Sequence, residues 1–168
     1  MAIVASETYT STSAPIQYAA ITAFQDYPDI DEYLRHSRRI LKALGNYVFG
    51  RLAAKKVTMP APKGAFYLFP NFNFYRDKLK AKGILTSFEL CETLLKEIGV
   101  AILPGTDFGR QPEELTCRIA YVDFDGEMVL ESAMNKYKNE LLSDDFILNN
   151  CRKMVEAVTK LEEWLDSL

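Results

Sequence analysis

The chain has 168 residues, a formal net charge of −3 and a hydrophobic share of 48%. That length suffices for one domain with a sizeable core, and the slight acidity, without a dense stripe of Lys and Arg, argues against nucleic acid as a partner. No apolar run approaches the roughly 20 residues of a membrane-spanning helix, and the N-terminus lacks the pattern of a secretory signal.

The cysteines favour a cytoplasmic protein. They are Cys91, Cys117 and Cys151, which are odd in number, widely spaced and set among apolar residues. None has the CxxC spacing of a metal or redox site. They are therefore expected to be reduced and to lie in or near the core, as is usual for cytoplasmic proteins.

The first 15 residues lack any hydrophobic period. Ser6–Pro15 is crowded with hydroxyl side chains, a composition typical of a flexible terminus or linker. A short helix is predicted from Ile16 to about Gln25, with Pro15 in its first turn and an end before Pro28.

A long amphipathic helix is predicted from Asp29 to about Ala54. Asp29 and Glu32 have the spacing of a capping box. The apolar positions, spaced at the helical period, are Ile30, Tyr33, Leu34, Ile40, Leu41, Leu44, Tyr47, Val48 and Leu52. Off this face lie Arg35, His36, Arg38, Arg39 and Lys42. We expect these polar residues on the solvated surface, and His36 has no Ser, Cys or metal-ligand partner nearby.

Three short apolar runs, each bounded by Gly or Pro, are predicted strands. They span Gly64–Phe69, Val100–Leu103 and Cys117–Val122, and are rich in Val, Ile, Phe and Tyr. Val57–Met59 is a further edge-strand candidate. A helical pattern separates the first strand from the second, and a turn-rich loop separates the second from the third. The pattern therefore predicts a small sheet with helices packed on it.

Start and stop signals define the helix between the first two strands. A polar loop is expected over Asn71–Gly83. Thr86 and Glu89 form a capping-box pattern before an apolar stripe, and Gly99 stands where a helix commonly ends in the left-handed conformation.

Two helices are predicted after the third strand. Asp123 or Asp125 can cap the first of them, over Gly126–Leu142. A final helix begins at about Ser143. Its apolar side carries Ile147, Cys151, Met154, Val155, Val158, Leu161, Trp164 and Leu165. These residues are expected to pack against the sheet or against another chain.

Arg118 is the one charge on a predicted strand that needs a partner. Because side chains alternate along a strand, one face carries Cys117, Ile119 and Tyr121, and the other carries Arg118, Ala120 and Val122. A guanidinium among apolar neighbours is not fully solvated, and its planar fork suits a carboxylate or phosphate. The residues alone leave two alternatives, an internal Asp or Glu and an anionic ligand.

Three motifs occur in a fixed order along the chain. They are P-x-G-A-F-Y-x-F-P at Pro62–Pro70, E-x-G-V-A-x-x-P-G-x-x-F-G at Glu97–Gly109, and R-I-A at Arg118–Ala120. Together they resemble the C-terminal part of class I/II aminotransferases, the pyridoxal-phosphate enzymes with the fold of aspartate aminotransferase. The resemblance implies an α/β (α+β) fold in which helices cover a small mixed or antiparallel sheet.

The resemblance also implies a division into domains. Residues 1–28 would form a loop and a short helix at the end of the large domain, with the loop reaching an active site shared across a homodimer. Residues 29–168 would form the C-terminal small domain, including the long interdomain helix.

The resemblance assigns Arg118 to the α-carboxylate of the substrate, an amino acid or a 2-keto acid. Pyridoxal phosphate would be the cofactor of the full-length protein. No lysine here stands in the family's Schiff-base motif, so no cofactor is expected to be bound covalently to this chain. The chain is thus expected to be a fragment that does not transaminate alone, with its cofactor-binding residues unknown and no metal site.

Two other interpretations remain open. A separate module could use Arg118 to hold a carboxylate without chemistry, or the terminal helices could form a dimerisation unit. The identity of the donor and acceptor is not encoded here. Glu7 lies near the place where some relatives carry an arginine for a second carboxylate, which slightly favours a substrate with one carboxylate.

Overall fold

The computed structural model describes residues 12–168. The predictions for the hydroxyl-rich start of the chain, including Glu7, lie outside this range. The chain divides into two units, one ending at Leu34 and the other comprising Arg35–Leu168. In the described part, no helix has both the length and the apolarity to cross a membrane.

The first unit contains the predicted short helix, α2, at Ala14–Ala23. Pro15 stands in its first turn, where a missing N–H costs nothing, so this prediction is confirmed. None of its residues is buried. Its exposed large apolar side chains are Ile16, Tyr18 and Ile21, and Phe24 follows at its C-terminus. The predicted boundary between the two domains, at residues 28 and 29, stays a prediction.

The long helix is α3, Pro28–Ala54, with 27 residues. It begins one residue earlier than predicted, so Asp29 lies in the first turn and the predicted capping box is wrong. The carboxylate still favours the helix N-terminus electrostatically. The predicted apolar stripe is buried at Ile40, Leu44, Tyr47, Val48 and Leu52, whereas Ile30, Tyr33 and Leu34 are exposed.

The sheet has three antiparallel strands in the order β1-β3-β2. They are β1 (Tyr67–Leu68), β2 (Leu103–Pro104) and β3 (Cys117–Ala120). Each is shorter than predicted, and the candidate strand at Val57–Met59 is reduced to one bridge, from Thr58 to Asn71. The α+β class with a small sheet is confirmed.

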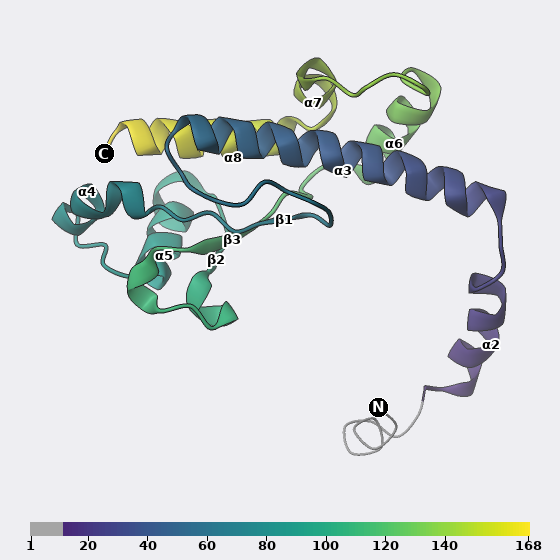
Figure 1. Cartoon of the computed structure of the whole chain (residues 1–168), viewed down its shortest axis with the longest axis horizontal. Helices are drawn as coiled ribbons and strands as arrows, with labels where there is room; N and C mark the ends of the chain where they lie inside the picture. Colours follow the sequence, from purple (N-terminus) through teal and green to yellow (C-terminus); the bar gives the residue numbers. More distant parts are fainter. Residues whose placement is uncertain (1–11) are drawn as a thin grey trace. The chain divides into compact units, whose positions relative to one another are not determined.

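Helices cover one face of this sheet. The paired residues Leu68 and Ile119, and Pro104 and Cys117, are buried there. Above the sheet, α3 runs alongside α8, Arg152–Asp166 (Figure 1). Ion pairs join the two helices, Arg51 with Glu162 and Lys55 with Asp166. The helix α5, Ser87–Ile98, contacts both β2 and α8.

Local signals fix both ends of α5 as predicted. Thr86 Oγ1 accepts from the Glu89 N–H at 3.2 Å, and the Glu89 carboxylate accepts from the Thr86 N–H at 2.9 Å. Gly99 ends the helix with φ +70°. The prediction of a polar loop over Asn71–Gly83 is wrong, because this segment contains η1 (Asn73–Tyr75) and α4 (Arg76–Ala81). This segment folds because Phe72, Tyr75 and Leu79 are buried in the core.

The helices after β3 are shorter than predicted. Asp125 caps α6, Gly126–Asn135, and accepts from the Met128 N–H at 3.0 Å, but the helix stops well before the predicted Leu142. The final helix is divided into α7, Asp144–Asn150, and α8. The division falls at Cys151, whose ψ of 46° is not helical.

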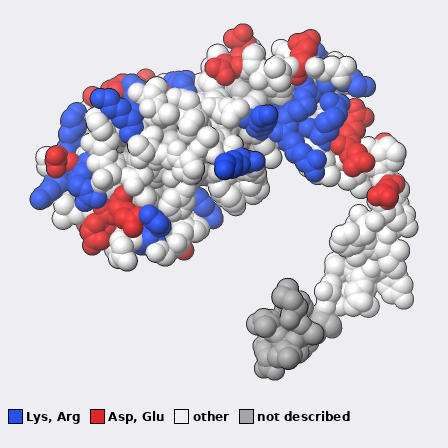
Figure 2. Space-filling view, in the orientation of Figure 1, with Lys and Arg blue, Asp and Glu red and all other residues white. Residues whose placement is uncertain are grey.

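His36 is buried, so its prediction as a surface residue is wrong. Its two ring nitrogens lie 2.6 Å from Arg35 Nη2 and 2.9 Å from Arg39 Nη1. Arg39 also donates to the main-chain carbonyls of Tyr137, Lys138 and Glu140. The chain after α6 therefore covers part of the polar side of α3, where Figure 2 shows a patch of Lys and Arg.

The three cysteines are free and buried, as predicted. Cys91 on α5 and Cys117 on β3 bring their Sγ atoms to 3.5 Å. The hydrogen bond with Cys91, together with burial, raises the pKa of the Cys117 thiol. Burial raises the pKa of Cys151 to about 11. Cys117 and Cys151 therefore stay protonated thiols at neutral pH, which is the behaviour of core residues.

Candidate carboxylate-binding site

Arg118 stands on the face of the sheet that the helices do not cover. It is half-buried in β3, between the buried Cys117 and Ile119. Leu103 of β2 lies directly opposite Arg118, and Tyr67 of β1 lies opposite Ala120. Because opposed residues of antiparallel strands share a face, Arg118, Leu103 and Tyr67 project to the same side.

Two aromatic rings hold the guanidinium. The Arg118 Cζ atom lies 4.4 Å from the ring centroid of Tyr67 and 4.4 Å from that of Phe108. Phe108 comes from η2, Gly105–Phe108, the turn that follows β2. Phe69 supports Phe108 edge to face, with ring centroids 5.8 Å apart. Such cation–π contacts, worth about 0.5–1 kcal/mol each at exposed sites, restrict the arginine before any ligand arrives.

Gly105 makes the turn of η2 possible. A Cβ atom at this position would lie 2.1 Å from Thr116 Oγ1 and 2.8 Å from the Thr116 carbonyl oxygen. The Gly105 N–H donates to that carbonyl at 2.7 Å. Gly109 then closes the turn with φ +75°. The P-G-x-x-F-G motif thus brings Phe108 to Arg118 by allowing a close backbone approach.

Arg118 has no Asp or Glu partner among residues 12–168. Its Nε atom is buried and makes no hydrogen bond with any described group. Of the two alternatives left by the sequence, the internal ion pair is therefore not formed in this part of the chain. A buried guanidinium nitrogen without an acceptor is costly, and an anionic ligand would remove that cost.

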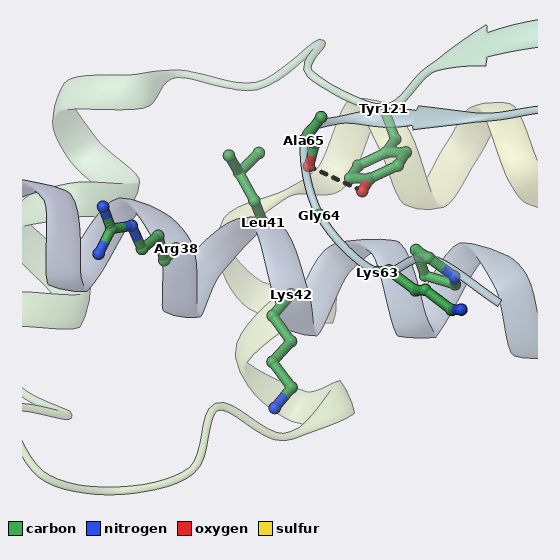
Figure 3. A pocket seen from close by; sticks show the side chains of 8 residues that line it. Arg38, Leu41, Lys42, Lys63, Gly64, Ala65 and Tyr121 are labelled. Carbon is green, nitrogen blue, oxygen red and sulfur yellow. Dashed lines mark hydrogen bonds between the residues drawn. The ribbon is translucent and has the colours of Figure 1, made fainter.

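A hollow of about 390 Å³ opens beside Arg118. Its other lining residues are Pro60, Ala61, Pro62, Lys63, Gly64, Tyr67, Leu68 and Phe69. A second hollow, of about 430 Å³, lies between the loop Pro62–Ala65 and α3 (Figure 3). Arg38 and Lys42 line it from the helix, and Lys63 lines it from the loop.

Tyr121 fixes the loop that divides the two hollows. Its Oη donates to the Ala65 carbonyl at 3.1 Å, the bond drawn in Figure 3. Ala65 has φ +55°, a left-handed conformation that needs such support. The ring is 1% exposed, and burial raises the pKa of its hydroxyl, which stays a donor. Gly45 of α3 makes room, since a Cβ there would lie 2.8 Å from Tyr121 Oη.

Sequence reasoning named Arg118 as a candidate site residue and did not name the residues around it. Side chains alternate along β1, so Tyr67 and the buried Leu68 point to different faces of the sheet. This alternation could have predicted that Tyr67 faces outward. Phe108 gives no such signal, because it reaches Arg118 through a turn whose path depends on Gly105 and Thr116.

The comparisons with known proteins agree with one another. The family model for aminotransferase class I and II matches residues 1–137. The chain belongs to the class I and II aminotransferase family. It is 34% identical over 118 residues to an aspartate/prephenate aminotransferase of Cereibacter sphaeroides, covering 68% of this chain and 29% of that protein. It is also 34% identical over 126 residues to an aromatic-amino-acid aminotransferase of Thermococcus litoralis, covering 75% and 29%.

Solved aminotransferase structures share the fold. The aromatic aminotransferase of Pyrococcus horikoshii superimposes with a TM-score of 0.53 at 29% identity, over 90% of this chain and 31% of that one. An aspartate aminotransferase from Thermotoga maritima gives 0.55 at 21% identity, which supports the fold alone. This member of the family thus spans about three-tenths of the length of the curated relatives it matches.

The lysines of the described range can be compared with the Schiff-base role that pyridoxal phosphate requires. That role needs a lysine whose amine is desolvated or placed beside another cation in an enclosed site. No lysine in residues 12–168 is buried, and residues 1–11 contain none. No group of His, Cys, Asp and Glu in the described range could hold a metal ion. The planar guanidinium of Arg118 suits a carboxylate or a phosphate.

Proposed function

We propose that this chain is the C-terminal part of a pyridoxal-phosphate-dependent aminotransferase, in which Arg118 binds the substrate α-carboxylate. The observation that supports this most is the orphan guanidinium. Arg118 is half-buried and stacked between two rings, with Nε lacking an acceptor among the described residues. Substrates would be an amino acid and a 2-keto acid, the reactant classes that an aminotransferase implies.

The chemistry expected of Arg118 is binding and orientation. A carboxylate can accept two parallel N–H···O bonds from a guanidinium, which fixes its angle as well as its position. Tyr67 and Phe108 limit the rotation of the guanidinium, so less conformational entropy is lost on binding. A substrate held by its carboxylate presents its reactive carbon in one geometry.

The Schiff-base lysine is proposed to belong to a part of the enzyme outside this chain. Pyridoxal phosphate, when bound there, supplies the electron sink for the chemistry at the substrate carbon. This chain would supply the carboxylate site and no covalent link. It would not transaminate by itself.

A cytoplasmic homodimer is part of the same proposal. The apolar, unburied surface of α2 is the structural feature that favours an assembly role. The final helices contribute less than expected to such a surface, because Phe146, Ile147, Val158, Leu161 and Leu165 are buried inside the chain. The alternative is a separate module that binds a carboxylate or forms a dimer without catalysis. It predicts that the protein that contains this chain has no transaminase activity.

Borohydride reduction tests the cofactor part of the proposal. Pyridoxal phosphate is added to the 168-residue chain, the mixture is reduced, and labelled peptides are identified by mass spectrometry. The proposal predicts scattered, substoichiometric labelling of surface lysines. Stoichiometric labelling of one lysine would contradict it. The protein that contains this chain should show transaminase activity with amino acid and 2-keto acid pairs, and the 168-residue chain alone should show none.

A further inference from the structure

A basic hollow of about 430 Å³ lies between α3 and the loop Pro62–Ala65 (Figure 3). The helix contributes Arg38 and Lys42 to its lining, and the loop contributes Lys63. Arg118 lines the other hollow and not this one. The helical period alone places Arg38 and Lys42 on a solvated face, and the loop opposite them makes that face concave. The hollow is therefore a candidate binding site separate from the carboxylate site.

Every charged residue that lines this hollow is a cation. These cations are Arg38, Lys42 and Lys63, and no Asp or Glu of the described residues lines it. Within residues 12–168, none of the three forms an ion pair. A concave surface with one sign of charge raises the local concentration of ligands of the opposite sign. Three unmatched positive charges favour a ligand with several negative charges over a single carboxylate.

The backbone on both sides of the hollow is held in place, and the charged ends are spread apart. Arg38 and Lys42 stand one turn apart within the 27-residue α3. Across from them, the Tyr121 hydroxyl donates to the Ala65 carbonyl at 3.1 Å, which anchors the loop. The ends of Arg38, Lys42 and Lys63 extend in different directions in Figure 3. A ligand that pairs with all three must therefore be extended and carry its charge along its length.

We infer that this hollow binds a polyphosphate, a chain of two or more linked phosphates, through Arg38, Lys42 and Lys63. Each phosphate of such a chain is charged at neutral pH and offers acceptor oxygens. Lysine binds a phosphate as a point charge, and arginine can donate two parallel N–H···O bonds to it. The volume lies within the range of small-molecule sites. The inference does not depend on the proposed function, because Arg118 takes no part in it.

The test uses the 168-residue chain at constant ionic strength. Tripolyphosphate and orthophosphate are titrated separately, and NMR follows the amide signal of Ala65, which lines this hollow and not the other. Tripolyphosphate should bind about ten-fold more tightly, because it reaches two further cations, each worth about two- to five-fold. Lys42→Gln and Lys63→Gln should each weaken its binding about two- to five-fold. Lys80→Gln, at an exposed position of α4, is the matched control and should leave the affinity unchanged.

The same titration with pyrophosphate and ADP identifies the source of the polyphosphate. Equal affinities would support an inorganic polyphosphate, because the nucleoside would then add nothing to binding. Tighter binding of ADP would support the diphosphate of a nucleotide.

Several results would overturn the inference. Loss of tripolyphosphate binding in Arg118→Gln would place the anion at the carboxylate site. Equal effects of Lys42→Gln, Lys63→Gln and Lys80→Gln would show general charge attraction. Equal affinities for tripolyphosphate and orthophosphate would show that the spread of the cations plays no part. Melting curves of each variant verify that all are folded.

Discussion

The guanidinium of Arg118 lies 4.4 Å from the centroid of the Phe108 ring, which reaches it from the turn after β2. This contact links β3 to the turn η2 through one side-chain pair. Under the proposed function, this contact orients the guanidinium toward the substrate carboxylate. Its removal should therefore affect binding more than folding.

Phe108→Leu should weaken carboxylate binding about two- to five-fold, because a cation–π contact at an exposed site is worth about 0.5–1 kcal/mol. The melting temperature should change little, since the ring is 39% exposed. Titration with 2-oxopentanoate measures the effect. Phe74→Leu is the control, because Phe74 makes a similar contact with Lys56 at 4.6 Å and lines neither hollow. Equal losses of affinity in both variants would contradict the prediction.

Gly45 and Gly50 of α3 should respond oppositely to alanine. Gly→Ala within a helix stabilises by roughly 0.5–1 kcal/mol, and Gly50 has nothing within 4 Å of the new Cβ, so Gly50→Ala should stabilise. At Gly45 the Cβ would meet Tyr121 Oη at 2.8 Å and Cζ at 2.9 Å. Overpacking costs about 1–3 kcal/mol, which exceeds the gain.

Urea unfolding of the two variants measures this difference. Combining Gly45→Ala with Tyr121→Phe should recover part of the loss, because the hydroxyl oxygen is the nearest clashing atom. A stabilised Gly45→Ala variant would mean that Tyr121 moves freely, and the loop at Ala65 would then lack its anchor.

The capping box of α5 should make stability depend on acid pH. Hydrogen bonds from the Leu85 N–H and then from Thr86 lower the pKa of Glu89. A carboxylate whose pKa is lower in the folded state contributes stability above its unfolded pKa and loses it as pH falls through the folded pKa. Glu89→Gln should therefore lower the melting temperature at pH 7, and the difference from wild type should vanish well below pH 4.5, the ordinary pKa.

Glu131→Gln on α6 is the matched control for the capping box. It makes the same charge change at an exposed helical position and should give a small difference at every pH. Thr86→Ala, which removes the reciprocal hydrogen bond, should cost about 1 kcal/mol. A Glu89→Gln effect that is independent of pH would contradict the electrostatic explanation.

Local rules predicted the parts of the fold whose causes are local. Thr86, Glu89 and Gly99 fixed α5 because their hydrogen bonds and backbone conformation involve near neighbours in sequence. His36 was misassigned because its burial depends on Arg39 reaching carbonyls about 100 residues away. Helical period cannot show which polar faces another segment will cover.

Of the candidate site, the sequence predicted only the charged residue, Arg118. Arg118 was recognisable as a cation on an apolar strand and by its family motif. Its stacking partners depend on the register of β1 and on the turn at Gly105, and Lys63 depends on the path of a loop held by Tyr121. These are tertiary relationships, and no spacing in the sequence specifies them.

Arg118→Lys in the enzyme that contains this chain is the most direct test of the carboxylate site. Lysine keeps the charge and loses the two-pronged geometry, which should cost about 2–4 kcal/mol of transition-state binding. The value of kcat/KM for amino and 2-keto acids should therefore fall roughly 30- to 1,000-fold. The melting temperature should stay close to that of the wild type, because the partner is a ligand and not the core. Normal turnover with a sharply lowered melting temperature would contradict the account and make Arg118 a structural residue.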